Sequence, residues 1–170
     1  MDFNQDHFTL FGLPRSFTVD GSALEQRYRD LQARVHPDRH AHLSDADQRL
    51  AMQWSTRVNE AYQTLRRPLS RAEYLLQLAG LDVHGERTMP TAFLVSQMEW
   101  REAIEDASGD EDALDVLRRR IRKEMAGQYV EFERLLNAGE LSGAAGLVRQ
   151  LMFQEKLLVE VDQALAALDA

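Results

Sequence analysis

Three consecutive residues, His36-Pro37-Asp38, bring an imidazole, a rigid ring and a carboxylate together in one short segment. Proline disfavours helical geometry at the residue before it, so a helix that approaches this segment should end at His36. Asp38 would then lie on a stiff turn, where its carboxylate can pair bidentately with an arginine of another molecule. His36 can form local hydrogen bonds that hold the turn, and Pro37 limits its freedom. The segment therefore predicts a rigid contact loop.

A second candidate for chemistry in this region is a cluster of imidazoles. His36, His40 and His42 have a spacing that invites a zinc site, and a metal-binding regulator is one alternative reading of the chain. Pro37 interrupts the helix that would align His36 with His40, and the chain has no cysteine to supply a thiolate. We therefore expect neither a metal nor a cofactor. Since no nucleophile–base arrangement and no Gly-rich phosphate loop is present, we do not expect an enzyme.

Two amphipathic helical patterns flank the contact loop and must position it. A capping pattern with Ser22 or Asp20 as the N-cap opens the first, and apolar residues then recur at helical spacing. The second pattern covers residues 44–67 and ends before a proline. Such helices should pack as an antiparallel hairpin, stripe to stripe, with the loop at one end. We expect the short apolar segment 8–13 to cover the open side.

This layout resembles a J domain over the first 75 or so residues. Similarity to the HscB family, the J-domain co-chaperones of iron–sulfur cluster assembly, extends through three further stretches, which are 8–14 (FTLFGLP), 68–76 (PLSRAEYLL) and 91–94 (TAFL). In J domains the His-Pro-Asp turn contacts a chaperone ATPase of the DnaK/HscA type and accelerates its ATP hydrolysis. The resemblance implies the same contact here. The residues that would make it are His36, Pro37, Asp38, Arg27, Arg29, Arg34 and Arg39.

The basic face that J domains use on this helix is only partly matched. Arg27 and Arg34 are seven residues apart and share one side of the helix, but Asp30 and Glu25 interrupt the positive charge. Val35 stands where many J domains have an aromatic residue. These departures could narrow the choice of chaperone partner. An ordinary solvated helix face is the alternative reading for any single arginine.

The rest of the chain is helical in period. A short helix is expected over 71–79, a hinge over 81–90, and longer helices over about 90–107, 110–137 and 141–168. Short connections favour an antiparallel three-helix bundle. We therefore predict an all-α protein in two domains, with a J domain over 1–75, a short helix and hinge over 76–89, and a three-helix bundle over 90–170.

Large apolar residues outside the core stripes of this bundle indicate a contact patch. On the last helix Ala144, Leu147, Leu151, Leu158 and Leu165 share one face, and Phe153 lies well off it. On the first bundle helix Leu94 and Met98 lie on a flank. In the HscB family, residues at such positions bind the iron–sulfur scaffold protein IscU. The resemblance carries that role onto Leu94, Val95, Met98, Glu99, Glu102 and Phe153. The alternative is a bundle that buries Leu94 and Met98 in its core.

Composition limits the functions that remain. Residues 1–75 carry ten basic and ten acidic side chains, whereas residues 76–170 carry ten basic and eighteen acidic ones. This balance argues against nucleic-acid binding and favours a basic or apolar protein partner for the second half. Without cysteine the chain cannot hold a cluster by thiolates, so it must act on a partner that does.

We expect no membrane contact, because no apolar run is long enough to span a bilayer and the start of the sequence is acidic. Together with the resemblance to the HscB family, this predicts a bacterial cytoplasmic co-chaperone, and the resemblance implies a chaperone ATPase of the HscA/DnaK type and IscU as partners. A general J-domain chaperone that binds unfolded clients is the alternative.

Overall fold

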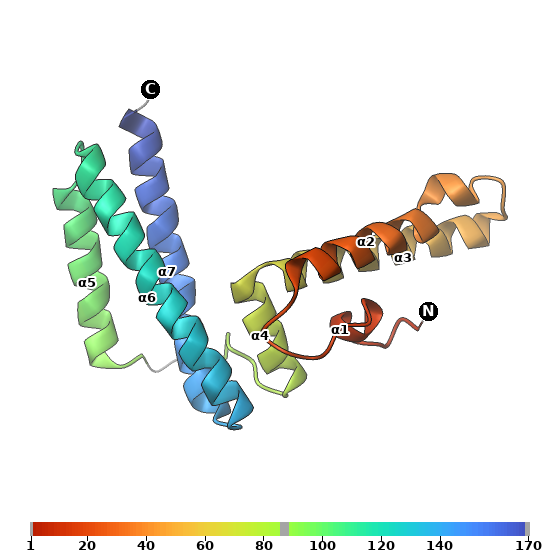
Figure 1. Cartoon of the computed structure of the whole chain (residues 1–170), viewed down its shortest axis with the longest axis horizontal. Helices are drawn as coiled ribbons and strands as arrows, with labels where there is room; N and C mark the ends of the chain where they lie inside the picture. Colours follow the sequence, from red (N-terminus) through yellow and green to blue (C-terminus); the bar gives the residue numbers. More distant parts are fainter. Residues whose placement is uncertain (1, 86–88, 169–170) are drawn as a thin grey trace. The chain divides into compact units, whose positions relative to one another are not determined.

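The computed structural model describes residues 2–85 and 89–168, and over these residues it contains helices and no strand (Figure 1). The prediction of an all-α protein is therefore confirmed. The chain divides into two compact units, Met1–Leu75 and Leu76–Ala170. None of the helices within the described part is long and apolar enough to cross a membrane.

The first unit is built on an antiparallel hairpin of two long helices, α2 (Gly21–Val35) and α3 (Asp45–Arg66), with the short 3-10 helix η1 (Pro37–His40) at the connecting end (Figure 1). The Asp20 carboxylate accepts hydrogen bonds from the first backbone N–H groups of α2, so Asp20 is the N-cap of that helix. Ser44 caps α3 in the same way.

Helices α2 and α3 pack on each other, and the short helix α1 (His7–Leu10) packs on α3. A buried core of this kind supplies most of the stability of amphipathic helices. Its members from the hairpin and the N-terminal segment are Phe8, Phe11, Leu24, Val35, Ala51, Trp54, Val58, Ala61 and Leu65.

Helix α4 (Pro68–Leu78) begins three residues earlier than the sequence pattern suggested. Proline suits the first turn of a helix, because its missing N–H would have no helical partner there. The carbonyl groups that α3 leaves unpaired at its end find side-chain donors in α4. Ser70 Oγ donates to the Thr64 carbonyl at 2.7 Å, and Arg71 Nη1 donates to the Leu65 carbonyl at 2.7 Å.

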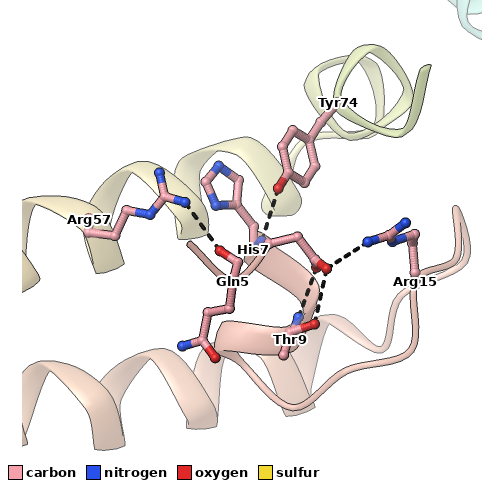
Figure 2. A network of polar contacts seen from close by, with 7 residues as sticks. Gln5, His7, Thr9, Arg15, Arg57 and Tyr74 are labelled. Atoms are coloured by element: carbon pink, nitrogen blue, oxygen red, sulfur yellow. Dashed lines mark hydrogen bonds and ion pairs between the residues drawn. The ribbon is translucent and has the colours of Figure 1, made fainter. Parts of the chain in front are cut away.

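A polar clamp joins the N-terminal segment to α3 and α4 (Figure 2). The His7 backbone N–H donates to the Tyr74 hydroxyl at 3.0 Å, and the two rings stack with centroids 4.3 Å apart. Arg57 Nη2 donates to the Gln5 carbonyl at 3.2 Å. Because partners this far apart in sequence give no local pattern, the sequence alone did not predict the clamp.

The second unit contains α5 (Thr91–Asp106), α6 (Glu111–Asn137) and α7 (Leu141–Leu168), which lie side by side (Figure 1). Helices α6 and α7 pack along much of their length, and α5 packs more sparsely on both. Buried apolar side chains come from all three helices, and they include Trp100, Leu114, Ile121, Phe132, Val148, Leu151, Leu157 and Val161.

The predicted core stripe of α7 was partly wrong. Leu147, Leu158 and Leu165 are only half-buried, while Val148 and Leu157 are fully buried. The buried face turns around the helix axis from one end of α7 to the other, so a single stripe at a fixed angle per residue does not describe it. The predicted hinge, 81–90, lies partly outside the described residues. Within it Val83 is buried, and its carbonyl accepts a hydrogen bond from Arg149 Nη1 at 3.4 Å.

Candidate functional site

The His-Pro-Asp segment lies where α2 gives way to η1. His36 is the residue that ends α2, and Pro37 starts the 3-10 turn. The Asp38 backbone N–H donates to His36 Nδ1 at 3.3 Å. Because Nδ1 accepts this bond, the ring proton lies on Nε2, and the imidazole acts as a cap for the turn. The local role expected of His36 matches this geometry.

Two further side chains hold the loop, His40 from η1 and Gln48 from α3, and sequence reasoning missed these roles. His40 Nε2 donates to the Arg34 carbonyl at 3.0 Å, which satisfies a carbonyl at the end of α2. From α3, Gln48 Nε2 donates to the carbonyls of Ala41 and Leu43 at 3.2 and 2.9 Å. In the sequence, the only indication of these Gln48 hydrogen bonds is that a polar residue lies in the first turn of a helix that follows a loop.

The Asp38 carboxylate is open to solvent. Its side chain is 91% exposed, compared with 55% for His36, and one of its oxygens lies 3.6 Å from His36 Nδ1. The backbone is thus fixed while the carboxylate remains accessible. Such a group can form a bidentate ion pair with an arginine of a docking partner at little cost in conformational entropy.

The four arginines grouped with this loop have different surroundings. Arg27 is engaged within the chain, because its Nη1 donates to the carbonyls of Phe11 and Gly12 at 3.0 and 3.3 Å. Arg29 forms a long, exposed ion pair with Glu25 at 3.6 Å.

Arg34 and Arg39 are both exposed near the loop. Neither takes part in the ion pair with Glu25 or in the hydrogen bonds to the carbonyls that hold Arg27. The two therefore offer positive charge beside the Asp38 carboxylate without first breaking a contact within the chain.

A second group of candidate residues lies on the outer face of α5. Leu94, Val95 and Met98 are 46%, 48% and 73% exposed. Glu99 and Glu102 are also exposed and border the apolar side chains. The alternative reading, in which Leu94 and Met98 belong to the core, does not hold. Neighbouring apolar side chains with an acidic border are typical of a protein-binding surface.

Phe153 is not a free surface residue, because its ring packs against α5. It is half-buried on α7, and its ring meets the Phe93 ring edge-on with centroids 5.8 Å apart. The Arg101 guanidinium lies over the same ring, 5.7 Å from the centroid. Phe153 therefore joins α7 to α5 next to the exposed side chains, and we call Leu94, Val95, Met98 and Phe153 the α5 patch.

The histidines near the loop are not part of any group of three potential metal ligands among the described residues. No group of three potential ligands comes together anywhere in residues 2–85 and 89–168. His36 and His40 each direct one ring nitrogen to the backbone, as described above.

Comparisons with known proteins agree with both halves of this description. Residues 6–74 match the family model of the DnaJ domain, and residues 89–162 match the model of the HSCB C-terminal oligomerisation domain. The co-chaperone protein HscB homolog of Aromatoleum aromaticum is 51% identical over 99% of this chain and 98% of its own. The homolog of Ralstonia nicotianae is 55% identical over 96% of each chain.

Solved structures show the same similarity in three dimensions. The chaperone HscB from Vibrio cholerae matches with a TM-score of 0.88 at 38% identity, over 96% of this chain and 99% of its own. The human co-chaperone protein HscB matches with a TM-score of 0.88 at 26% identity, over 96% and 83%.

A J domain with an exposed His-Pro-Asp loop, followed by a helical domain of this type, defines a J-domain co-chaperone. Such a protein acts through a second chaperone. The chain belongs to the HscB family of co-chaperones, as the sequence resemblance implied.

Proposed function

We propose that this protein stimulates ATP hydrolysis by a DnaK/HscA-type chaperone and delivers the iron–sulfur scaffold protein IscU to it. Residues 1–75 would dock on the chaperone ATPase, and residues 90–170 would bind the scaffold. The single observation that carries the proposal is the pairing, in one chain, of the exposed Asp38 carboxylate with an apolar patch on a separate unit. As the bacterial relatives suggest, we place the protein in the bacterial cytoplasm.

The contact with the chaperone ATPase would be made by the loop and the basic side chains beside it. Asp38 would pair with an arginine of the ATPase, and His36 and Pro37 would hold the loop in place. Arg34 and Arg39, together with Arg29, would face an acidic surface. Exposed charges of this kind mainly raise the association rate and select the partner, so the contact should weaken as salt rises.

The scaffold would bind the α5 patch. Exposed apolar side chains supply the buried area, and Glu99 and Glu102 at the border select a partner with basic residues around its own apolar surface. Holding both ligands on one chain raises their effective concentration toward each other, which is how a co-chaperone couples delivery to ATP hydrolysis.

The scaffold-binding half of the proposal is tested by calorimetric titration of purified IscU into the full-length protein. Replacing Met98 or Leu94 by alanine should weaken binding about tenfold, because central apolar contacts dominate interface energies. Val130→Ala is the matched control, since Val130 is 72% exposed on α6, outside the patch. Affinity that survives Leu94→Ala and Met98→Ala together would assign the scaffold site elsewhere.

A further inference from the structure

A cavity of about 270 Å³ lies between the three helices of the second unit, directly beneath α5. Phe93 and Trp100 line it from α5, and Phe153 lines it from α7. Phe153 is also part of the α5 patch, so the cavity adjoins the surface proposed to bind the scaffold. Its volume suits one long side chain rather than a folded segment.

The wall of this cavity includes a buried amide with a free acceptor. Gln154 is only 2% exposed, and its Nε2 donates to Glu124 Oε1 at 2.8 Å. A carboxylate oxygen can only accept a hydrogen bond, so the amide atom that faces Glu124 must be the nitrogen Nε2 and the other must be the oxygen Oε1. Gln154 Oε1 is then buried with no donor among the described residues. Gln128 Oε1 is likewise buried without a donor. Leaving such an acceptor unpaired costs free energy, which a matching donor would recover.

The Glu124 carboxylate and the aromatic rings that line the cavity favour a cation as that donor. Glu124 contributes a carboxylate to the lining, and the unit as a whole is acidic. The chain's own guanidinium groups already lie over two of the lining rings. Arg120 is 4.6 Å from the centroid of Trp100, and Arg101 is 5.7 Å from that of Phe153. Aromatic faces of this kind attract a positive charge.

We propose that the cavity beneath α5 receives a positively charged side chain, an arginine or lysine of the docked scaffold. This side chain donates to Gln154 Oε1 and pairs with the Glu124 carboxylate, while the aromatic rings enclose its aliphatic stem. The inference rests on the proposed function, because it specifies the chemistry of the scaffold's contact. It adds a polar anchor to a surface that otherwise offers apolar area.

The first test is calorimetric titration of IscU into the Gln154→Leu variant. Leucine keeps the volume but removes the acceptor, so binding should weaken about tenfold. Thermal unfolding of the free variant should occur close to the wild-type temperature, because removing the unpaired buried acceptor offsets the lost hydrogen bond to Glu124. Gln163→Leu, exposed on the same helix, is the matched control and should bind as the wild type does.

The second test concerns the charge. Glu124→Gln retains an acceptor but removes the carboxylate, so binding should weaken and depend less on salt. Wild-type affinity in both Gln154→Leu and Glu124→Gln would overturn the inference. If Leu94→Ala still weakens binding in that case, the scaffold site stands and the cationic anchor alone fails. If IscU does not bind the wild-type protein at all, the proposed function fails first.

Discussion

The polar clamp around His7 makes the first unit sensitive to acid in a defined pH range. His7 is 9% exposed, and its Nδ1 is buried with no partner among the described residues. Burial, reinforced by the nearby charge of Arg57 and opposed by that of Asp6, lowers the pKa of His7 from 6.5 to about 4. Protonating this ring would place a charge against the Tyr74 ring and beside a guanidinium (Figure 2).

The sign and size of the effect follow from proton linkage. The unfolded chain takes up the proton near pH 6.5, whereas the folded chain resists it until about pH 4. The stability that follows from keeping His7 neutral is therefore fully present above pH 6.5, and it is lost as the pH falls toward 4. At pH 5 the loss amounts to about 2 kcal/mol.

Asp6 contributes in a separate range. Burial raises the pKa of Asp6, but hydrogen bonds from Arg15 and Thr9 and the Arg15 charge outweigh it, and the pKa falls from 3.8 to about 2. The Asp6 contribution is complete above pH 3.8 and is lost only as the pH falls from there toward 2. The pH ranges in which His7 and Asp6 affect the free energy of unfolding are therefore separate, and at pH 5 only His7 contributes to the loss.

Urea unfolding at pH 7.5 and pH 5 measures this effect. In a Trp100→Phe background, fluorescence of Trp54, which is buried against Phe3, reports the first unit. The parent should lose about 2 kcal/mol between the two pH values, and His7→Phe, which preserves the ring stack, should lose little of it. His42→Gln, a change at an exposed histidine, is the control. An unaltered pH dependence in His7→Phe would refute the assignment.

Two further predictions separate the arginines of α2. Arg27→Met should lower the free energy of unfolding of the first unit by about 1–3 kcal/mol, because its hydrogen bonds to the Phe11 and Gly12 carbonyls are lost; unchanged urea unfolding would contradict that structural role. Arg34→Ala should leave unfolding unchanged and weaken binding to the chaperone ATPase roughly threefold at low salt, as measured by surface plasmon resonance, and wild-type binding would exclude Arg34 from the contact.

The helices of this chain could be predicted because their signals are local. Capping residues, apolar periodicity and prolines fall within one or two turns of the boundaries that they set. Pro68 predicts the end of α3, and in the structure it is also the first residue of α4, a position that suits proline. The exposed positions of Leu94 and Met98 also follow from periodicity, because both lie on a flank of the helical stripe that contains the buried Trp100.

Contacts between distant residues could not be predicted in this way. His7 and Tyr74 are 67 positions apart, and neither stands out from its neighbours in the sequence. Its position on the helix face predicts that Arg27 contacts the chaperone ATPase. In the structure its guanidinium donates to the carbonyl of Phe11, sixteen residues earlier. Gln154 was overlooked because the buried face of α7 rotates along the helix, so its burial was not apparent from a fixed stripe.

The central claim, that the rigid His36-Pro37-Asp38 loop drives another protein's nucleotide chemistry, is tested most directly by single-turnover ATP hydrolysis in the cognate chaperone. Asp38→Asn keeps the shape of the side chain and removes its charge. We predict that this variant retains its helical content by circular dichroism and loses stimulation of hydrolysis, while Asp106→Asn, a change at the exposed end of α5, stimulates as the wild type does. Full stimulation by Asp38→Asn would contradict the account.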